Sequence, residues 1–313
     1  MADANVELQH IGLYPVTRLL RESSTSRLYL GKQPTRKKDV CIRVLNTPFA
    51  NDETKEAFLS RVKQIKKFSH RYAVPVLDFG LTKASDTSDE VGYLVMQFVA
   101  GETFQQRIPP GQQLAPDEVK RLLTPIAEVL HYAHTKNILH GNLHPGNLLT
   151  GPNKETLITD FSLTLQQPVN PFDDVAAAIP YMSPEQLNGT ETPASDQYAL
   201  AVMVYEWLCG QRPYKANERA TLLYQQELEA LRAPSSLNSA ISPNVESVLL
   251  MALAYQPEER FSDIQKFADN YLHALMGVPF TVEIKRPSAP TGKDTKKNGN
   301  LNGHQLDSVE NAL

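Results

Sequence analysis

Four short segments of the chain concentrate the residue types that can do chemistry. They are VCIR, which ends at Arg43, HGNLHPGN, which ends at Asn147, DFS, which begins at Asp160, and MSPEQ, which contains Glu185. Amide and carboxylate oxygens are ligands of the kind that Mg²⁺ takes, and a guanidinium matches phosphate and carboxylate groups. Each segment alone is a weak signal, so its meaning depends on the order of the four and on the elements that position them.

The first segment lies in a part of the chain that is predicted to be rich in β-structure. β-Branched and aromatic runs separated by polar stretches are typical of an antiparallel sheet. Such runs occur at residues 14–20, 27–32, 40–45, 74–79 and 92–99. Between them, an apolar stripe at helical spacing predicts one helix over residues 53–68. The stripe consists of Phe58, Val62, Ile65 and Phe68.

The other three segments lie in a part that is predicted to be mainly helical. Helical periodicity occurs at residues 116–135, 195–209, 244–254 and 260–276. Pro243 and Pro257 are at or near the helix starts that proline favours. We therefore predict an α+β fold of two lobes: a small antiparallel β lobe with one helix over residues 11–99, and a larger, mainly α-helical lobe over residues 101–276.

The two ends of the chain are predicted to lie outside this fold. Residues 1–10 form an N-terminal extension without the basic and apolar regions of a signal peptide. Residues 281–313 are polar and nearly free of large apolar side chains, so we expect them to be disordered. No run of 18 apolar residues occurs, which predicts no membrane-spanning helix and a cytoplasmic location.

Composition excludes two classes of partner. The 313 residues carry a formal net charge of −4, so no broad positive field favours nucleic acid or an anionic membrane. The two cysteines, Cys41 and Cys209, are far apart in apolar runs and are interpreted as small buried hydrophobes of a reduced compartment.

In this order, the four segments resemble the signature motifs of protein kinases. VCIR stands at V-A-I-K, HGNLHPGN at H-R-D-L-K-P-x-N, DFS at D-F-G and MSPE at A-P-E. The segments SDQYAL and GQRPY resemble the central helix region of bacterial Ser/Thr kinases, and the resemblance covers about residues 11–276. HGNLHPGN is also similar to H-G-D-x-H-x-x-N of small-molecule kinases, but that pattern has no place for MSPEQ or for the helix of Asp196.

The resemblance implies an intact scaffold. Glu185 should form a buried ion pair with Arg260, and Asp196 should hold the backbone of the catalytic loop near His140. A buried pair needs both partners, because leaving one charge alone costs about 3–5 kcal/mol. A hydrophobic column between the lobes is expected from Ile65, Leu77, Phe161 and His140.

The phosphate-binding loop departs from the kinase pattern. Glycine there allows backbone amides to approach the phosphates of ATP, yet Arg21, Ser23 and Ser26 occupy the three glycine positions. The serine hydroxyls are able to donate to phosphate, whereas Glu22 is expected to face the same region and repel it.

The charged pair of the small lobe also differs from the kinase pattern. Arg43 replaces the phosphate-binding lysine, and Arg61 stands at the position of the helix glutamate that should orient it. Two like charges about 4 Å apart repel by roughly 4 kcal/mol at an effective dielectric near 20. Residues 57–77 contain no Asp or Glu, so no shift of register supplies the missing acid.

The catalytic loop shows the clearest loss. Asn142 replaces the aspartate that acts as base, and general-base catalysis contributes about 10²–10⁴-fold. His144 replaces the neighbouring lysine, and Gly141 replaces the arginine that would contact an activation-loop phosphate. Ala178 replaces the threonine that contacts the base.

The resemblance leaves nucleotide binding open. Asn147 and Asp160 stand where kinases hold Mg²⁺, although the same side chains could be inherited structure that caps turns and bonds loop backbone. Ser162 adds a Cβ at the glycine of D-F-G. Nucleotide contacts are implied for Ser23, Ser26, Leu28, Cys41, Arg43, Met96, Gln97, Val99 and Leu149.

The leading hypothesis is a pseudokinase, a kinase-like binding or allosteric module with impaired or absent phosphoryl transfer. Whether this module binds Mg-ATP as a cofactor is left open. The alternatives are an active Ser/Thr kinase with an atypical site and a nucleotide-sensing scaffold. A protein partner of unknown identity is expected. The helix over residues 217–232 is either a docking surface or simply a solvated face.

Overall fold

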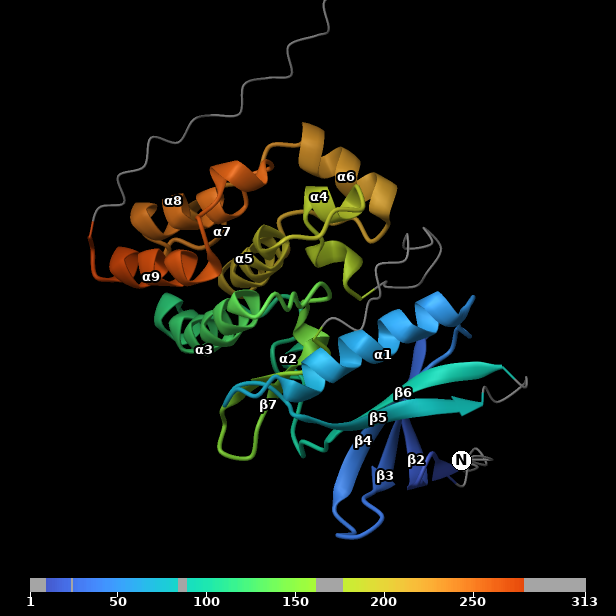
Figure 1. Cartoon of the computed structure of the whole chain (residues 1–313). Helices are drawn as coiled ribbons and strands as arrows, with labels where there is room; N and C mark the ends of the chain where they lie inside the picture. Colours follow the sequence, from blue (N-terminus) through green and yellow to red (C-terminus); the bar gives the residue numbers. More distant parts are fainter. Residues whose placement is uncertain (1–9, 24, 84–88, 162–176, 279–313) are drawn as a thin grey trace, which may run out of the picture. The chain divides into compact units, whose positions relative to one another are not determined.

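The computed structural model describes residues 10–23, 25–83, 89–161 and 177–278. These residues form a β-rich lobe with one long helix and a larger helical lobe (Figure 1), which is the predicted α+β fold. Ser162, residues 1–9 and the tail over 281–313 lie outside the described residues, so the predictions for them stay predictions.

The small lobe contains a six-stranded antiparallel sheet with the strand order β1-β2-β3-β4-β6-β5. Its strands are β1 (His10–Ile11), β2 (Tyr14–Glu22), β3 (Ser26–Lys32), β4 (Asp39–Leu45), β5 (Val76–Lys83) and β6 (Glu90–Gln97). All five predicted strands are present. β5 begins later than predicted because the backbone N–H of Val74 donates to the carbonyl of Ile158 in the helical lobe.

Alternate residues of β4 face opposite sides of this sheet, as the two-residue period of a strand requires. Ile42 belongs to an apolar cluster on one side. Arg43 is paired with Leu94 on β6, and Leu94 packs against Phe58 on the other side. Because directly opposed residues share a face, Arg43 lies on the side of the sheet that the long helix covers.

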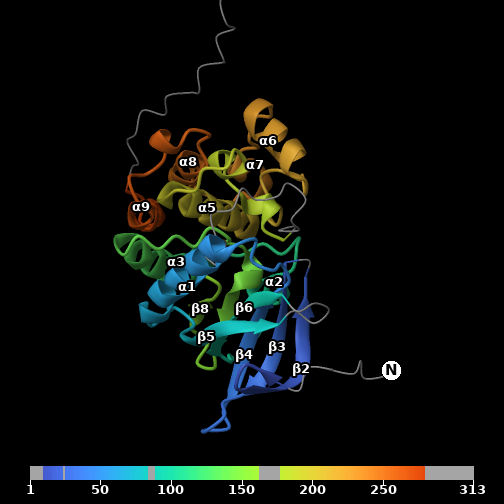
Figure 2. The same ribbon diagram turned by 45° about the vertical axis from the view of Figure 1, so that its right-hand side comes forward.

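That helix is α1 (Asp52–Lys67), which lies beside β5 (Figures 1 and 2). Asn51 begins the helix by accepting a hydrogen bond from the N–H of Thr54, which satisfies one of the free donors of the first turn. The predicted apolar stripe is confirmed, since Phe58, Val62 and Ile65 are buried.

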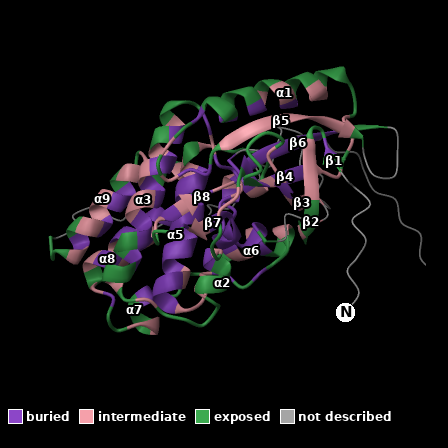
Figure 3. Cartoon of the chain, turned by 90° about the horizontal axis from the view of Figure 1, so that it is seen from below, coloured by how far each residue is buried: buried purple, intermediate pink, exposed green. Residues whose placement is uncertain are grey.

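The larger lobe is built around a buried central helix. Its elements are α2 (Phe104–Arg107), α3 (Pro116–Thr135), β7 (Leu148–Thr150), β8 (Thr156–Ile158), α4 (Pro184–Leu187), α5 (Pro193–Cys209), α6 (Arg219–Leu228), α7 (Pro234–Leu237), α8 (Pro243–Ala252) and α9 (Ile264–Leu275). α5 is mostly apolar and buried along nearly its whole length (Figure 3). It ends at Gly210, whose φ of 71° is the left-handed conformation that glycine adopts without strain.

The last predicted helix begins later than expected. Pro257 opens only a short 3₁₀ turn, and Arg260 is extended. α9 begins at Ile264 because the side chain of Asp263 accepts from the N–H of Lys266 and caps the helix. Among the described residues, no helix is both long enough and apolar enough to cross a bilayer.

Candidate active site

A buried carboxylate on α5 holds the loop that follows α3. Asp196 accepts hydrogen bonds from the backbone N–H groups of His140 and Gly141, both at 2.9 Å, and lies 2.8 Å from Nε2 of His134. Burial raises the pKa of Asp196, but the bonds and the nearby imidazoles outweigh it and hold the pKa below its usual value. The predicted role of Asp196 is confirmed.

Gly141 adopts a left-handed conformation in this loop, with a φ of 68°. A residue with a side chain pays about 1–2 kcal/mol there. Gln186 donates from Nε2 to the carbonyl of Gly141 at 2.9 Å, which fixes the peptide. Glycine therefore removes strain from the position where kinases have arginine.

His140 belongs to the column that joins the lobes. Its ring lies 5.0 Å from that of Phe161, which in turn lies 5.0 Å from Phe68 of the small lobe. Nε2 of His140 donates to the carbonyl of Thr159 at 3.0 Å, and burial lowers the pKa of this imidazole. His140 therefore packs in the column as predicted, and its imidazole is neutral.

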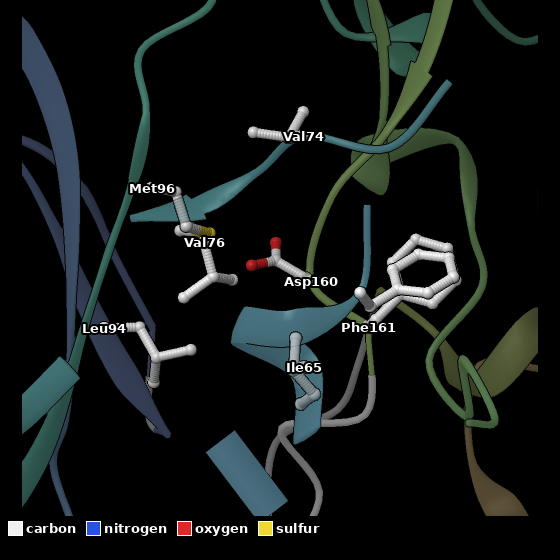
Figure 4. Close-up of a pocket in the computed structure, with 8 residues that line it drawn as sticks. Ile65, Val74, Val76, Leu94, Met96, Asp160 and Phe161 are labelled. Atoms are coloured by element: carbon white, nitrogen blue, oxygen red, sulfur yellow. The ribbon is translucent and has the colours of Figure 1, made fainter. Parts of the chain in front are cut away.

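The assignment of Leu77 to the predicted column is wrong. Leu77 packs against the cluster on the opposite side of the sheet, because neighbouring residues of a strand face opposite sides. The preceding residue, Val76, lines a small cavity with room for about one water molecule (Figure 4). Its walls are Ile65, Phe68, Val74, Val76, Leu94, Met96, Asp160 and Phe161.

Arg43 and Asp160 form a buried ion pair at the junction of the lobes. Nη2 of Arg43 lies 2.6 Å from Oδ2 of Asp160, and the two side chains are 11% and 4% exposed. Nη1 of Arg43 donates to the hydroxyl of Ser26 at 3.4 Å. Nε of Arg43 is buried and has no hydrogen-bond partner among the described residues. Asp160 has a φ of 66°, an uncommon conformation for a residue with a side chain.

Arg61 takes no part in this pair. Its Nη1 lies 3.4 Å from Oε1 of Gln64 on the same helix. Partial burial lowers the pKa of Arg61, and Glu191 is the charge that opposes the shift. Arg43 and Arg61 therefore do not form the closed pair of active kinases, as their like charges predict, and Arg43 bonds to Asp160 instead.

Three side-chain oxygens around the catalytic loop are buried without a hydrogen-bond partner among the described residues. They are the Oδ1 atoms of Asn142, Asn147 and Asp160. Nδ2 of Asn147 donates to the carbonyl of Asn142 at 2.9 Å, so Oδ1 is the free end of that amide. Such oxygens fit Mg²⁺, and Asn147 and Asp160 would hold the ion. Bound there, the ion would compensate phosphate charge. Oδ2 of Asp160 is already bonded to Arg43, so only Oδ1 of this carboxylate is free for an ion.

The loop between β2 and β3 is closed by its own hydroxyls. Oγ of Ser23 donates to the carbonyl of Ser26 at 3.0 Å and accepts from the Ser26 N–H at 3.1 Å. Nδ2 of Asn46 donates to the carbonyl of Ser23 at 2.8 Å. The Ser23 hydroxyl proton is thus used within the loop, and Ser26 is the hydroxyl that faces Arg43.

The prediction that Glu22 faces the phosphate region is wrong. Its Oε1 accepts from Nε of Arg27 at 2.6 Å on the exposed side of the hairpin. Arg21, one residue earlier, is paired with Leu28, and Leu28 is paired with Arg43. Arg21 therefore lies on the same face of the sheet as Arg43. The replacement of glycine by Arg21 did not by itself indicate this face. The alternation of Arg21 and Glu22 along the strand was the signal that could have found it.

The residues predicted to contact a nucleoside are only partly brought together. Cys41 is paired with Met96 on the face of Arg43, and Leu28 lies next to Arg43 on β3. Gln97 is exposed and paired with Val40, so its side chain belongs to the opposite face. Leu149 on β7 and Val99 after β6 are half-buried.

The two cysteines differ in exposure. Cys209 is buried as predicted, whereas Cys41 is only half-buried. Burial and Asp160 raise the pKa of Cys41 to about 11, so the group is a neutral thiol.

His144 cannot supply the charge of the lysine that it replaces. Burial, and then the nearby His140, Arg21 and Arg43, lower the pKa of His144 to about 3. Its Nδ1 accepts from the N–H of Gly146 at 3.1 Å, which caps the short turn Pro145–Asn147. Its role in the structure is that of a neutral cap.

The scaffold of the substrate platform is complete. Nη1 and Nη2 of Arg260 donate to the two carboxylate oxygens of Glu185 at 2.8 and 2.9 Å. The remaining donors of Arg260 reach the carbonyls of Ala194, Ala254 and Tyr255. The predicted buried pair is confirmed. Ala178 and Asn142 line one small hollow, so the position lacking threonine is indeed next to the position lacking the base.

The fold and this site define a protein kinase domain. A model of the protein kinase domain matches residues 14–273, and the chain therefore belongs to that family. Serine/threonine-protein kinase PrkC of Bacillus subtilis is 27% identical over 257 residues, which are 80% of this chain and 38% of PrkC. Serine/threonine-protein kinase PknB of Mycolicibacterium smegmatis is 27% identical over 261 residues, or 81% and 41% of the two chains. PknB of Mycobacterium tuberculosis is 25% identical over 302 residues, or 94% and 48%. The chain thus spans less than half the length of these curated relatives, and the predicted kinship with bacterial Ser/Thr kinases is confirmed.

Proposed function

We propose that this kinase domain is a pseudokinase, a binding or allosteric module that transfers phosphoryl groups weakly or not at all. The observation that carries the proposal is the ion pair between Arg43 and Asp160, at 2.6 Å. In active kinases the lysine of the small lobe pairs with a helix glutamate, and the aspartate of D-F-G holds Mg²⁺. Here one interaction replaces both, and α1 offers no acid beyond residue 56.

The catalytic loop supports the same proposal. The Asn142 amide cannot accept a proton at neutral pH, which predicts a deficit of about 10²–10⁴-fold. His144 is neutral, so it cannot stabilise charge on the transferred phosphoryl group. Nucleotide binding, a protein partner and a cytoplasmic location are parts of the proposal that rest on the family and on the sequence.

The direct test is transfer from radiolabelled ATP by the full chain, with Mg²⁺ or Mn²⁺ and a generic protein substrate. We expect incorporation into substrate and into the chain itself to equal that of the Asp160→Ala variant. Arg36→Ala, an exposed substitution in the turn between β3 and β4, is the matched control. Turnover that depends on Asp160 would establish instead an active kinase with an atypical site.

A further inference from the structure

Arg21 and Arg43 form a pair of cations on the face of the sheet that α1 covers. Arg21 on β2 and Arg43 on β4 are both paired with Leu28 on the strand between them. Their backbones are therefore about 10 Å apart, at roughly 4.8 Å per strand, which two arginine side chains can bridge. Arg21 is exposed and has no hydrogen-bond partner among the described residues.

The charge balance around this pair is positive. Asp160 pairs with Arg43 and also lies near enough to act on Arg21, so one carboxylate faces two guanidinium groups. Glu22 is turned to Arg27 on the exposed side of the hairpin, and α1 presents no carboxylate from residue 57 onward. His140 and His144 face the same region, and burial keeps both neutral. The described charged groups thus sum to one positive charge, which attracts an anion and repels a dication.

A buried donor in the same place also lacks a partner. Nε of Arg43 is buried with no acceptor among the described residues, although Nη1 and Nη2 of the same group are bonded. A buried donor on a charged group that lacks an acceptor is unfavourable. An anionic oxygen would satisfy it.

We propose that the cleft binds a nucleoside triphosphate without a divalent metal ion, with the guanidinium groups of Arg21 and Arg43 in place of the metal. This inference rests on the nucleotide-binding part of the proposed function. A bound dication lowers the negative charge of the triphosphate, so excess Mg²⁺ weakens binding. The half-buried Cys41 on the same face would contact the nucleoside. A bare polyphosphate lacks this contact.

The test is calorimetric titration and thermal unfolding of the full chain with ATP, in EDTA and in excess Mg²⁺. We expect ATP to bind in EDTA at least as tightly as in Mg²⁺, and Mg²⁺ alone to leave the unfolding temperature unchanged. Tripolyphosphate should bind more weakly than ATP. Arg21→Ala should weaken binding in EDTA by about tenfold or more, since a hydrogen bond to a charged group contributes at least about that factor.

Arg36→Ala is the matched control, because it removes one exposed positive charge at the far end of the β3–β4 hairpin. Binding that requires Mg²⁺, the absence of ATP binding in both buffers, or unchanged affinity of Arg21→Ala would each overturn the inference. Tripolyphosphate binding as tight as ATP would overturn its nucleoside part. These outcomes are separate from the transfer assay, since a failure of the proposed pseudokinase would appear there as turnover.

Discussion

Nη2 of Arg43 lies 2.6 Å from Oδ2 of Asp160, which ties β4 of the small lobe to the segment after β8 in the helical lobe. Both side chains are nearly inaccessible to solvent, so neither charge is compensated by water. The pair therefore acts on stability and on ligand binding together. It holds the lobes in contact and also occupies the carboxylate that a metal ion would need.

We predict that Arg43→Met destabilises the domain by about 3–5 kcal/mol, because Asp160 is left as a lone buried charge. The double variant Arg43→Met, Asp160→Asn should recover most of this loss, since neither charge is then buried alone. Urea unfolding of the wild type, both single variants and the double variant measures the coupling. Single effects that simply add would show that the two side chains do not form a pair in solution.

We predict that stability falls between pH 7 and pH 5 in a way that depends on His144. Its pKa is lowered from 6.5 to about 3 in the folded chain. The unfolded chain therefore binds the proton first, so the contribution is complete above pH 6.5 and is lost as the pH falls toward 3. The loss attributable to this group between pH 7 and pH 5 is about 2 kcal/mol.

Urea unfolding at the two pH values measures this effect, with His144→Asn as the variant that keeps a side-chain acceptor. The wild type should lose about 2 kcal/mol more than the variant over this interval. His140 titrates in the same direction and remains in both proteins, so it cancels in the comparison. Equal losses in the two proteins would contradict a buried, neutral His144.

We predict that Asn142→Asp alone does not restore phosphoryl transfer. The substitution returns a group able to accept a proton, but Arg43 still occupies Asp160 and Ala178 still lacks the hydroxyl next to the base. The assay is the radiolabelled transfer described above, with unfolding measurements to confirm that the variant is folded. Recovery of turnover by at least about 100-fold would show that the base was the single missing part.

The sequence by itself determined the fold and the identity of the scaffold. Hydrophobic spacing located the five main strands and the long helices, because burial of an apolar face depends on a local period of two or 3.6 residues. The pairing of Glu185 with Arg260, and the support of the loop by Asp196, followed from complete motifs. The losses at Asn142 and His144 were also visible as changes of residue type.

The tertiary structure decided which charges meet. The like charges of Arg43 and Arg61 predicted that these two would not pair, but not that Arg43 would bond to Asp160, 117 positions away in the chain. The faces assigned to Leu77 and Glu22 were wrong because strand register and the bulge in β2 decide the side on which a residue lies. A charged side chain takes the partner that folding brings within a few ångströms. For that reason the shared face of Arg21 and Arg43 appeared only when the strands were paired.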